Sequence, residues 1–551
     1  MQHAPPLPPP LKTPATNLST EDAAVPLKRF QLEAPTNLSR SLLWKIQRNY
    51  YQRLGVDAWR KGLVPHYITS NAWVAQLYAQ ITLGHLRDIA ASQPDVKRVN
   101  IIELGAGSGR FSFHFIKKFF DLHSRSTLDH IQVRLVMTDL VAHNVAFWQQ
   151  HPALAPYVAS GQLDFAQFDV ENPHPIHLIG CGDILVPGQG SPIIVFANYV
   201  FDTVQCDLFS LEDGMLHEQW VAVNGPTPQP DFSDGGLIKK LTIDYEEHVI
   251  DDTHYQDSAL NQILAEYKQE FLNGVITIPS GAIRCLEYLA SMAGGQLLAL
   301  VADRGHNHQQ ALIDDPGPAM AIHDGCFSLM VNFHALGRWV ALQGGLALHP
   351  SSRSIELNFS TLVLGRSAAA SRETVFAFSS TADQRGPETF HMLKTGLDKM
   401  FEHQDLDHIM AVLRLCEWDA SPFMTALPHM VPLLAAASAT TRRDLRNTID
   451  NVWNLYYPLG EENDLAFNMA GLLYEMGFFQ EAAGYLRHSL NVSEPDPGIL
   501  FNLARCAYRL QQFPEALELT NKALELDPNF TAANMMRTRL LDDQKQHVKT
   551  L

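Results

Sequence analysis

The sequence predicts an α/β protein in which a doubly wound sheet of mainly parallel strands precedes an all-α domain of helical repeats. Between residues 41 and 399, short apolar runs rich in β-branched residues alternate with helical stretches. This alternation is typical of a parallel sheet with helices on both faces. From residue 400 onward the pattern is helical, and its last part repeats with a fixed period. The chain, at 551 residues, is also longer than one hydrophobic core usually organises.

Composition narrows the class of protein. Hydrophobic residues make up 46% and charged residues 18% of the chain, as in globular proteins of the cytoplasm, where we expect this one. The sequence contains no run of about 18 uncharged apolar residues and no secretory signal pattern at its N-terminus, so we expect no membrane association. A net charge of -18, without a dense Lys/Arg cluster, argues against nucleic acid as a partner.

The cysteines do not indicate a metal site or a disulfide framework. They are scattered, with no C-x-x-C pair and no paired Cys/His spacing. We therefore expect reduced, mostly buried thiols and no bound metal. The six are Cys181, Cys206, Cys285, Cys326, Cys416 and Cys506.

Residues 1–40 are predicted to be a disordered leader, because they are rich in Pro, Ala, Thr and Ser and poor in aromatic residues. The proline run at 5–10 could serve as a polyproline ligand, although a flexible tail accounts for it without a receptor.

Residues 41–399 are predicted to form the α/β domain. Each strand candidate is short, bounded by turn residues and rich in β-formers. A crossover helix is expected at 111–120, and the last two strands follow an insertion. The expected strands are residues 99–104, 133–138, 163–168, 193–197, 295–302 and 354–359.

The C-terminal part repeats every 34 residues, which is the tetratricopeptide (TPR) period. Small alanines at repeating positions let two helices approach each other. Because two units do not bury their faces alone, residues 400–462 are expected to stack on the repeats of 463–551 as a cap or as degenerate repeats. A helical bundle with a chance period is the alternative. The matching pairs are Ala470 and Ala504, Tyr474 and Tyr508, Phe479 and Phe513, and Ala482 and Ala516.

A glycine-rich turn follows the first strand of the sheet. Glu103 ends this strand, and Gly105, Gly107 and Gly109 then lead directly into a helix. Glycines allow positive φ and close backbone approach, and the helix start offers free N–H groups. A dinucleotide site would read G-x-G-x-x-G and face a pyrophosphate, whereas E-x-G-x-G-x-G suits a nucleotide-like ligand without phosphates. A packing role for the glycines remains the alternative.

Two acids follow the next two strands. Asp139, with Leu140, closes the second strand and could accept the hydroxyls of a ribose. Asp169, with Val170, closes the third and could receive an adenine amine. Either acid alone would suggest a helix cap or a turn. Two at successive strand ends, after the glycine turn, favour a ligand that carries adenosine.

The fourth strand runs into Asn198, Tyr199 and Asp202. Strand ends at the carboxyl edge of such a sheet face the crevice where ligands bind. These residues are therefore candidates to touch the ligand or a second substrate. A cap or turn role stays open for Asp202.

The motifs, in this order and spacing, resemble the MidA-like family of S-adenosylmethionine-dependent methyltransferases, which includes the mitochondrial complex I assembly arginine methyltransferase. The resemblance covers about residues 45 to 350. It implies a Rossmann-like class I methyltransferase domain that uses S-adenosyl-L-methionine. The similar segments are residues 66–71, 103–110, 198–203, 302–305 and 324–345.

The motifs and the resemblance together define the predicted site. The catalytic candidates are Asn198, Tyr199 and Asp202, and Tyr67 either closes the site or packs in the core. The expected cofactor-binding residues are Glu103, Gly105, Ala106, Gly107, Gly109, Asp139, Leu140, Asp169, Val170 and Asn198.

Departures from the family pattern concern the acceptor. Tyr199 stands where the family has Glu, Gln205 where it has Pro, and Arg304 where it has Tyr. A guanidinium is best oriented by carboxylates that pair with it bidentately. The missing carboxylate therefore weakens the case for an arginine acceptor.

Three functions follow from these observations. The first is a methyltransferase that transfers the methyl group in line to a nitrogen or oxygen of a protein or peptide, recruited on the concave face of the repeats. The second is a weakly catalytic or non-catalytic scaffold or assembly factor that binds the donor. The third is a small-molecule methyltransferase whose repeats serve docking or homo-oligomerisation.

Overall fold

The structure is a computed structural model, and it describes residues 29–64, 67–251, 253–314, 320–351, 357–460, 464–492 and 496–550. Residues 1–28 of the predicted leader, with the proline run, lie outside the described residues, as does His66 of the 66–71 segment.

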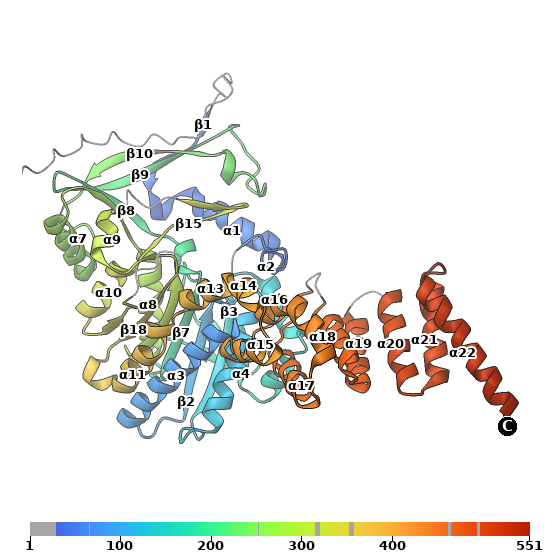
Figure 1. Cartoon of the computed structure of the whole chain (residues 1–551). Coiled ribbons are helices and arrows are strands. Elements are labelled where there is room, and N and C mark those ends of the chain that lie inside the picture. Colours follow the sequence, from blue (N-terminus) through green and yellow to red (C-terminus); the bar gives the residue numbers. More distant parts are fainter. Residues whose placement is uncertain are drawn as a thin grey trace, which may run out of the picture.

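Seven strands form the central sheet, in the order β17-β18-β12-β7-β2-β3-β4 (Figure 1). Strands β12, β7, β2, β3 and β4 run parallel to one another, while β18 is antiparallel to β12 and to β17. The chain builds the sheet outward from β2 through β3 and β4, and then returns to β7 on the other side of β2. The bounds are β2 Arg98–Leu104, β3 Gln132–Asp139, β4 Leu163–Gln167, β7 Ile193–Asn198, β12 Leu297–Asp303, β17 Leu346–Leu348 and β18 Asn358–Leu364.

The predicted parallel sheet is therefore confirmed, with one shifted strand. A strand was expected at 354–359, but β18 begins at Asn358, and residues 352–356 lie outside the described part of the chain. The Asn358–Leu364 run is buried along its whole length, as a strand covered on both faces requires.

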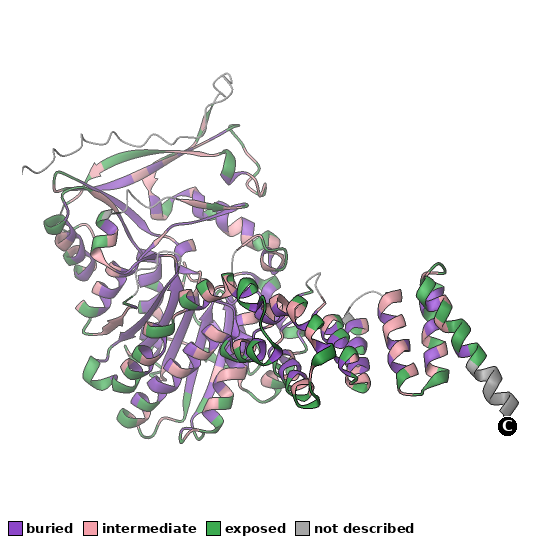
Figure 2. Ribbon diagram, viewed as in Figure 1, coloured by how far each residue is buried: buried purple, intermediate pink, exposed green. Residues whose placement is uncertain are grey.

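Helices cover both faces of this sheet. Because successive residues of a strand point to opposite faces, each strand contributes side chains to two hydrophobic cores. Ile101 belongs to one hydrophobic core and Ile102 to the other. Figure 2 shows the buried strands between the two helical layers. One layer contains α3 (Ala72–Ser92), α4 (Arg110–Ser124), α5 (Ala142–Gln150) and α11 (Arg372–Ser380), and the other α8 (Ser280–Met292) and α10 (Phe333–Leu342), the latter packed on α7 (Ser258–Glu270).

A second, antiparallel sheet is built mostly from the segment between β7 and β12. It lies above the central sheet in Figure 1. Its outer strand β1 comes from the N-terminal region and pairs with β9. The strands are β1 Phe30–Asn37, β8 Asp207–Glu212, β9 Met215–Gly225, β10 Thr242–Val249 and β11 Gly274–Ile278.

Strand β1 corrects the predicted leader, which was expected to be disordered as far as residue 40. Residues 30–37 pair with a strand almost two hundred residues away, a partner that local composition does not reveal. Pro35 lies between Glu33 and Thr36, where the register shifts and the ladder is irregular. The Glu33 carboxylate also accepts the backbone N–H of Leu42 at 2.8 Å, which caps the first helix, α1 (Leu42–Leu54).

The C-terminal part is entirely helical in the described residues (Figure 1). Its hydrophobic core already includes Phe390 of α13, so helical packing begins before residue 400. Helices α18 to α22 project away from the sheets in Figure 1. The longer helices are α13 Pro387–Thr395, α15 Leu406–Leu415, α16 Ala420–Met430, α17 Ala439–Asn454, α18 Leu465–Met476, α19 Phe479–Val492, α20 Pro497–Arg509, α21 Phe513–Leu526 and α22 Thr531–Thr550.

The repeat recurs in the side-chain contacts. The Arg505 guanidinium lies 4.2 Å from the ring centre of Tyr474, and Arg539 lies 5.0 Å from that of Tyr508. The same cation–π contact therefore joins α18 to α20 and α20 to α22, at the repeat spacing. Ala482 and Ala516, the predicted small positions, are completely buried.

Two further expectations can be compared with the described residues. All six cysteines are free, and all except Cys181 are buried, as predicted. No described helix is both long enough and apolar enough to cross a bilayer.

Candidate functional site

A cavity with an empty volume of about 1100 Å³, counting its open mouth, lies at the carboxyl edge of the parallel strands. It opens between β2 and β7. At this point the strand order reverses, because β3 and β4 were added on one side of β2 and β7 on the other, and open α/β sheets bind ligands at such points. Every predicted site residue lines it except Gly109 and Asp202. The predicted residues in the lining are Glu103, Gly105, Ala106, Gly107, Asp139, Leu140, Asp169, Val170, Asn198 and Tyr199.

The glycine turn requires glycine for both conformation and space. Gly105, Gly107 and Gly109 have φ values of 58°, 54° and 80°, in the left-handed region that side chains disfavour. A Cβ on Gly107 would lie 2.8 Å from the indole of Trp59. The Trp148 indole N–H donates to the Gly107 carbonyl at 2.9 Å, so α5 holds the turn in place.

Gly109 lies on the side of the turn away from the cavity, which corrects its predicted contact with the cofactor. A Cβ there would lie 2.9 Å from Met137 and 3.0 Å from the hydroxyl of Tyr457. Its role is to turn the chain into α4 against a tightly packed surface.

Asp139 ends β3 inside the cavity wall. One carboxylate oxygen accepts the Gly107 N–H at 3.1 Å and the other the Val141 N–H at 2.9 Å. Burial raises the pKa of Asp139, and these backbone donors oppose the rise. A carboxylate oxygen can accept two hydrogen bonds, so Asp139 can still accept the hydroxyls of a ligand.

Glu103 is buried at the end of β2 and accepts a hydrogen bond from the Ser112 hydroxyl of α4. The pKa of Glu103 is raised to about 8, mainly by burial and also by the charge of Asp139, while the hydrogen bond from Ser112 opposes the rise. A cationic group bound beside Glu103 would favour its ionised form.

Asp169 lines the cavity, and its role as the adenine acceptor stays a prediction, although both of its oxygens already accept hydrogen bonds. Its two oxygens accept hydrogen bonds from the two terminal nitrogens of Arg48, at 3.0 and 2.8 Å. They also accept the Glu171 N–H at 3.0 Å and the Asn172 amide at 2.9 Å. Arg48 bonds to the Glu171 carboxylate as well, at 2.8 Å. Asp169 therefore anchors helix α1 to the sheet.

Asn198 and Tyr199 follow β7 at the cavity. The Asn198 side-chain oxygen accepts from the buried Tyr78 hydroxyl, while its amide nitrogen is buried without a partner among the described residues. Tyr199 has a φ of 54°, which a non-glycine residue rarely adopts. Strain of this kind concentrates at functional sites, where the fold imposes the position of a side chain.

Asp202 does not line the cavity, which corrects its predicted place beside the reacting groups. It is buried against Asp303 at the end of β12. Burial and the negative charge of Asp202 raise the pKa of Asp303 well above its ordinary value, which favours a proton between the two carboxyl groups. Asp303 also accepts the Phe201 N–H at 3.0 Å, which fixes the chain after β7.

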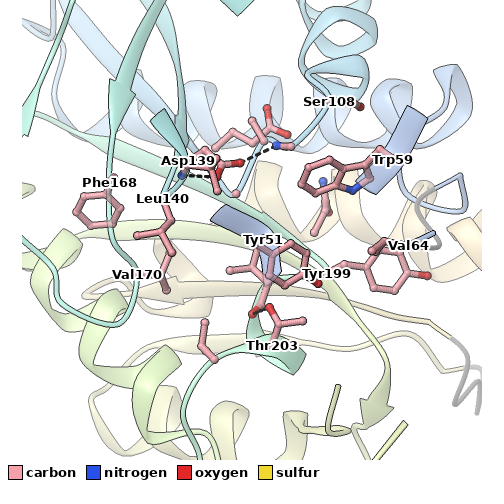
Figure 3. Close-up of a pocket in the computed structure, with 18 of the residues that line it drawn as sticks. Tyr51, Trp59, Val64, Ser108, Asp139, Leu140, Phe168, Val170, Tyr199 and Thr203 are labelled. Atoms are coloured by element: carbon pink, nitrogen blue, oxygen red, sulfur yellow. Dashed lines mark hydrogen bonds between the residues drawn. The ribbon is translucent and has the colours of Figure 1, made fainter. Parts of the chain in front are cut away.

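The N-terminal region contributes one wall of the cavity, which was not predicted from the sequence. Tyr51 of α1 and Trp59 of α2 (Asp57–Arg60) are stacked with ring centres 6.3 Å apart. Figure 3 shows Trp59 and Tyr199 across the cavity from Leu140, Phe168 and Val170. The density of aromatic residues between 44 and 59 was the available signal. The lining residues from this region are Gln47, Arg48, Tyr51, Trp59, Val64, Thr69 and Ser70.

Tyr67 does not line the cavity. Its hydroxyl donates to Asp419 of the helical region at 2.6 Å, and Lys394 lies 3.4 Å from the centre of its ring. Among the described residues, no group of three or more His, Cys, Asp or Glu side chains is arranged to hold a metal ion.

Comparison with protein families identifies two segments. The model described as "Putative S-adenosyl-L-methionine-dependent methyltransferase" matches residues 79–333. These residues are similar to that methyltransferase family. A tetratricopeptide-repeat model matches residues 497–530, which confirms the predicted repeat. The methyltransferase match begins at residue 79, after the seven lining residues that the N-terminal region contributes.

Solved structures similar to the chain include two members of one superfamily from Burkholderia thailandensis. An uncharacterized protein is 15% identical, with a TM-score of 0.38, and the match covers 60% of this chain and 87% of that protein. A member bound to S-adenosyl-homocysteine is 14% identical, with a TM-score of 0.39, over 60% and 88%. A TPR protein of Thermus thermophilus is 18% identical, with a TM-score of 0.21, over 31% and 90%. No curated protein matches the chain.

Proposed function

We propose that the chain is a class I, Rossmann-like methyltransferase that binds S-adenosyl-L-methionine in this cavity. The observation that carries the proposal is the meeting, at one sheet edge, of the left-handed glycine turn, the buried Asp139 carboxylate and the unpartnered Asn198 amide. The cavity also fits a ligand without phosphates. Arg48 is the one Lys or Arg side chain in the described lining, and it is already paired with two carboxylates.

Each part of the donor has a counterpart in the lining. Asp139 suits the ribose hydroxyls. Leu140, Phe168 and Val170 give an apolar slot for the adenine (Figure 3). Glu103 suits the ammonium of the methionine moiety, because an adjacent cation stabilises its ionised form.

The donor supplies a methyl group activated by a positive sulfonium, so the work of the protein is alignment and exclusion of water. Tyr51, Trp59 and Tyr199 provide the aromatic wall that excludes water from the mouth of the cavity. Asp169 and Glu171 are committed to Arg48, and Asp202 is bonded to Asp303 away from the lining. An acceptor that attacks through its own lone pair, without needing a carboxylate base, fits this wall best.

We further propose that the acceptor is a protein or peptide held by the TPR-like repeats. Stacked repeats offer extended concave surfaces for such partners. In this division, residues 29–386 form the methyltransferase domain, a helical cap follows from about residue 387, and the repeats occupy 463–551. The cap boundary rests on Phe390, which packs in the helical core.

The test is transfer of a tritium-labelled methyl group from the donor to a cell lysate, fractionated into protein and small molecules. We expect label on one protein band, and loss of that label when the chain is truncated after residue 495, with S-adenosylhomocysteine binding as the control for folding. Label in the small-molecule fraction would make the enzyme a small-molecule methyltransferase. Binding without transfer to any fraction would indicate the scaffold.

A further inference from the structure

The segment 455–460 joins α17 to α18 and packs against the glycine turn; we call it the strap. Tyr457 is 1% exposed, and its ring stacks on His151 with centres 4.0 Å apart. The Pro458 carbonyl lies 3.0 Å from a ring nitrogen of His151. With Leu459, Tyr457 belongs to the core formed by β2 and α4 and not to the core of the helical region. The strap is therefore part of the α/β body.

The strap reaches the donor side of the molecule at one point. The Tyr457 hydroxyl lies 3.0 Å from the position of a Cβ on Gly109, and it has no hydrogen-bond partner among the described residues. Gly109 starts α4, and Gly107, two residues before it, lines the cavity. The strap thus supports one side of the turn whose other side faces the ligand.

A second contact leads from the helical region to the same turn. Asp419, at the start of α16, is 3% exposed. Its carboxylate accepts from the Tyr67 hydroxyl at 2.6 Å and from the Ala72 N–H at 3.2 Å. The two residues before it, Glu417 and Trp418, have φ values of 57° and 61°, which cost energy in non-glycine residues. Such strain persists where surrounding contacts fix a side chain, here the carboxylate of Asp419.

The negative charge of Asp419 also influences Arg110, which follows Gly109 at the start of α4. Arg110 is half-buried. Burial lowers the pKa of Arg110, and the negative charge of Asp419 opposes this by favouring the guanidinium. A salt bridge of 2.7 Å between Lys118 of α4 and Glu417 holds the two elements together nearby.

We propose that the strap and Asp419 are structural parts of the donor site, so that donor binding and docking of the helical region stabilise each other. Tyr457 and Asp419 are positioning residues, because they act on the turn from the side away from the cavity. The inference rests on the proposed function. Coupling of this kind is reciprocal. The free energy by which docking of the helical region strengthens donor binding equals the free energy by which the donor stabilises that docking.

Hydrogen exchange of the full chain, with and without S-adenosylhomocysteine, tests this directly. We expect the ligand to slow exchange of amides in 417–421 and in the strap, as well as in the glycine turn, while α20 to α22 are unchanged. Protection of the glycine turn without protection of 417–421 and the strap would overturn the coupling and leave the proposed function intact. If isothermal titration detects no binding heat and hydrogen exchange shows no protection, both the coupling and the proposed function would be overturned.

A matched pair of variants gives the second test. Asp419→Asn keeps the size of the side chain and removes its charge, and we expect it to weaken S-adenosylhomocysteine binding at least fivefold, the lower end of typical coupling. Asp450→Asn changes a carboxylate of the same region that is 45% exposed and accepts from Tyr485 at 3.2 Å, and we expect an affinity within twofold of wild type. Equal affinities for the two folded variants would overturn the proposal. If Asp419→Asn does not fold, the exchange experiment on the wild-type chain decides.

Discussion

Gly107 lines the cavity beside the indole of Trp59, and its backbone is left-handed. Gly107→Ala would place a Cβ 2.8 Å from that indole and add a backbone cost of about 1 to 2 kcal/mol. Because Trp59 or the turn must move, we expect the affinity for S-adenosylhomocysteine to fall at least tenfold, measured by isothermal titration.

Gly161 offers a matched control for this substitution. It has a φ of 73°, so Gly161→Ala carries the same backbone cost, but no atom lies within 4 Å of the new Cβ. Its donor affinity should stay within twofold of wild type. Similar losses for both variants would mean that strain alone, and not the crowding at the cavity, reduces binding.

Glu103 makes stability depend on pH. Its folded pKa of about 8 lies above the ordinary value of 4.5, so its contribution to stability is complete below pH 4.5 and is lost as the pH rises through 8. The loss is at most about 1.4 kcal/mol for each pH unit in this interval. We expect Glu103→Gln to remove it, so that the variant gains in Tm relative to wild type between pH 5 and pH 8. Glu402→Gln, at an exposed site, serves as the control, and parallel Tm profiles for Glu103→Gln and wild type would contradict this account.

The sequence pattern predicts which residues lie at strand ends, but not which distant side chains bind them. The positions of Glu103, Gly107 and Asp139 followed from the order of strands and turns, because the carboxyl ends of parallel strands meet at one edge. Asp169 has the same signature, yet its oxygens are bonded to Arg48, a residue 121 positions away. Asp202 likewise depends on Asp303, which the chain reaches only at β12. A pattern gives the strand end that a residue follows, not the distant side chain that binds it.

At the scale of elements, the α1 helix is held by the contact of Arg48 with Asp169. The two side chains are 28% and 16% exposed and bonded bidentately, so their interaction is only partly screened. In a double-mutant cycle of Arg48→Ala and Asp169→Asn, we expect a coupling free energy of about 1 to 3 kcal/mol from urea unfolding. If the effects of the two substitutions on the free energy of unfolding add to within about 0.5 kcal/mol, the Arg48–Asp169 contact does not hold α1.

Elements differ in how far local sequence determines them. The repeat helices were predictable because equivalent side chains make the same contacts 34 residues apart, as the Arg505–Tyr474 and Arg539–Tyr508 contacts illustrate. Strand β1 was not, because its hydrogen bonds go to β9, far along the chain. The lining from α1 and α2 was missed for a related reason: an aromatic side chain in a helix is usually core, and only the fold directs Trp59 over the glycine turn.

For the whole molecule, the helical region and the α/β domain cannot be separated at residue 400. Removal of residues 400–551 takes away Tyr457, whose buried ring fills a space beside α4, and loss of a buried aromatic side chain alone costs about 3 to 5 kcal/mol. We expect this truncation to unfold or aggregate and to lose donor binding. Truncation after residue 495 keeps the strap and should bind the donor within twofold of wild type, as measured by titration. A folded, donor-binding fragment 1–399 would contradict this division.

We place the donor between the glycine turn and the ends of β3 and β7. A crystal structure of the full chain with S-adenosylhomocysteine tests this placement most directly. We expect ligand density against Gly105 and Gly107, with the ribose hydroxyls bonded to Asp139. Density at another site, or none in this cavity at a saturating ligand concentration, would contradict the claim.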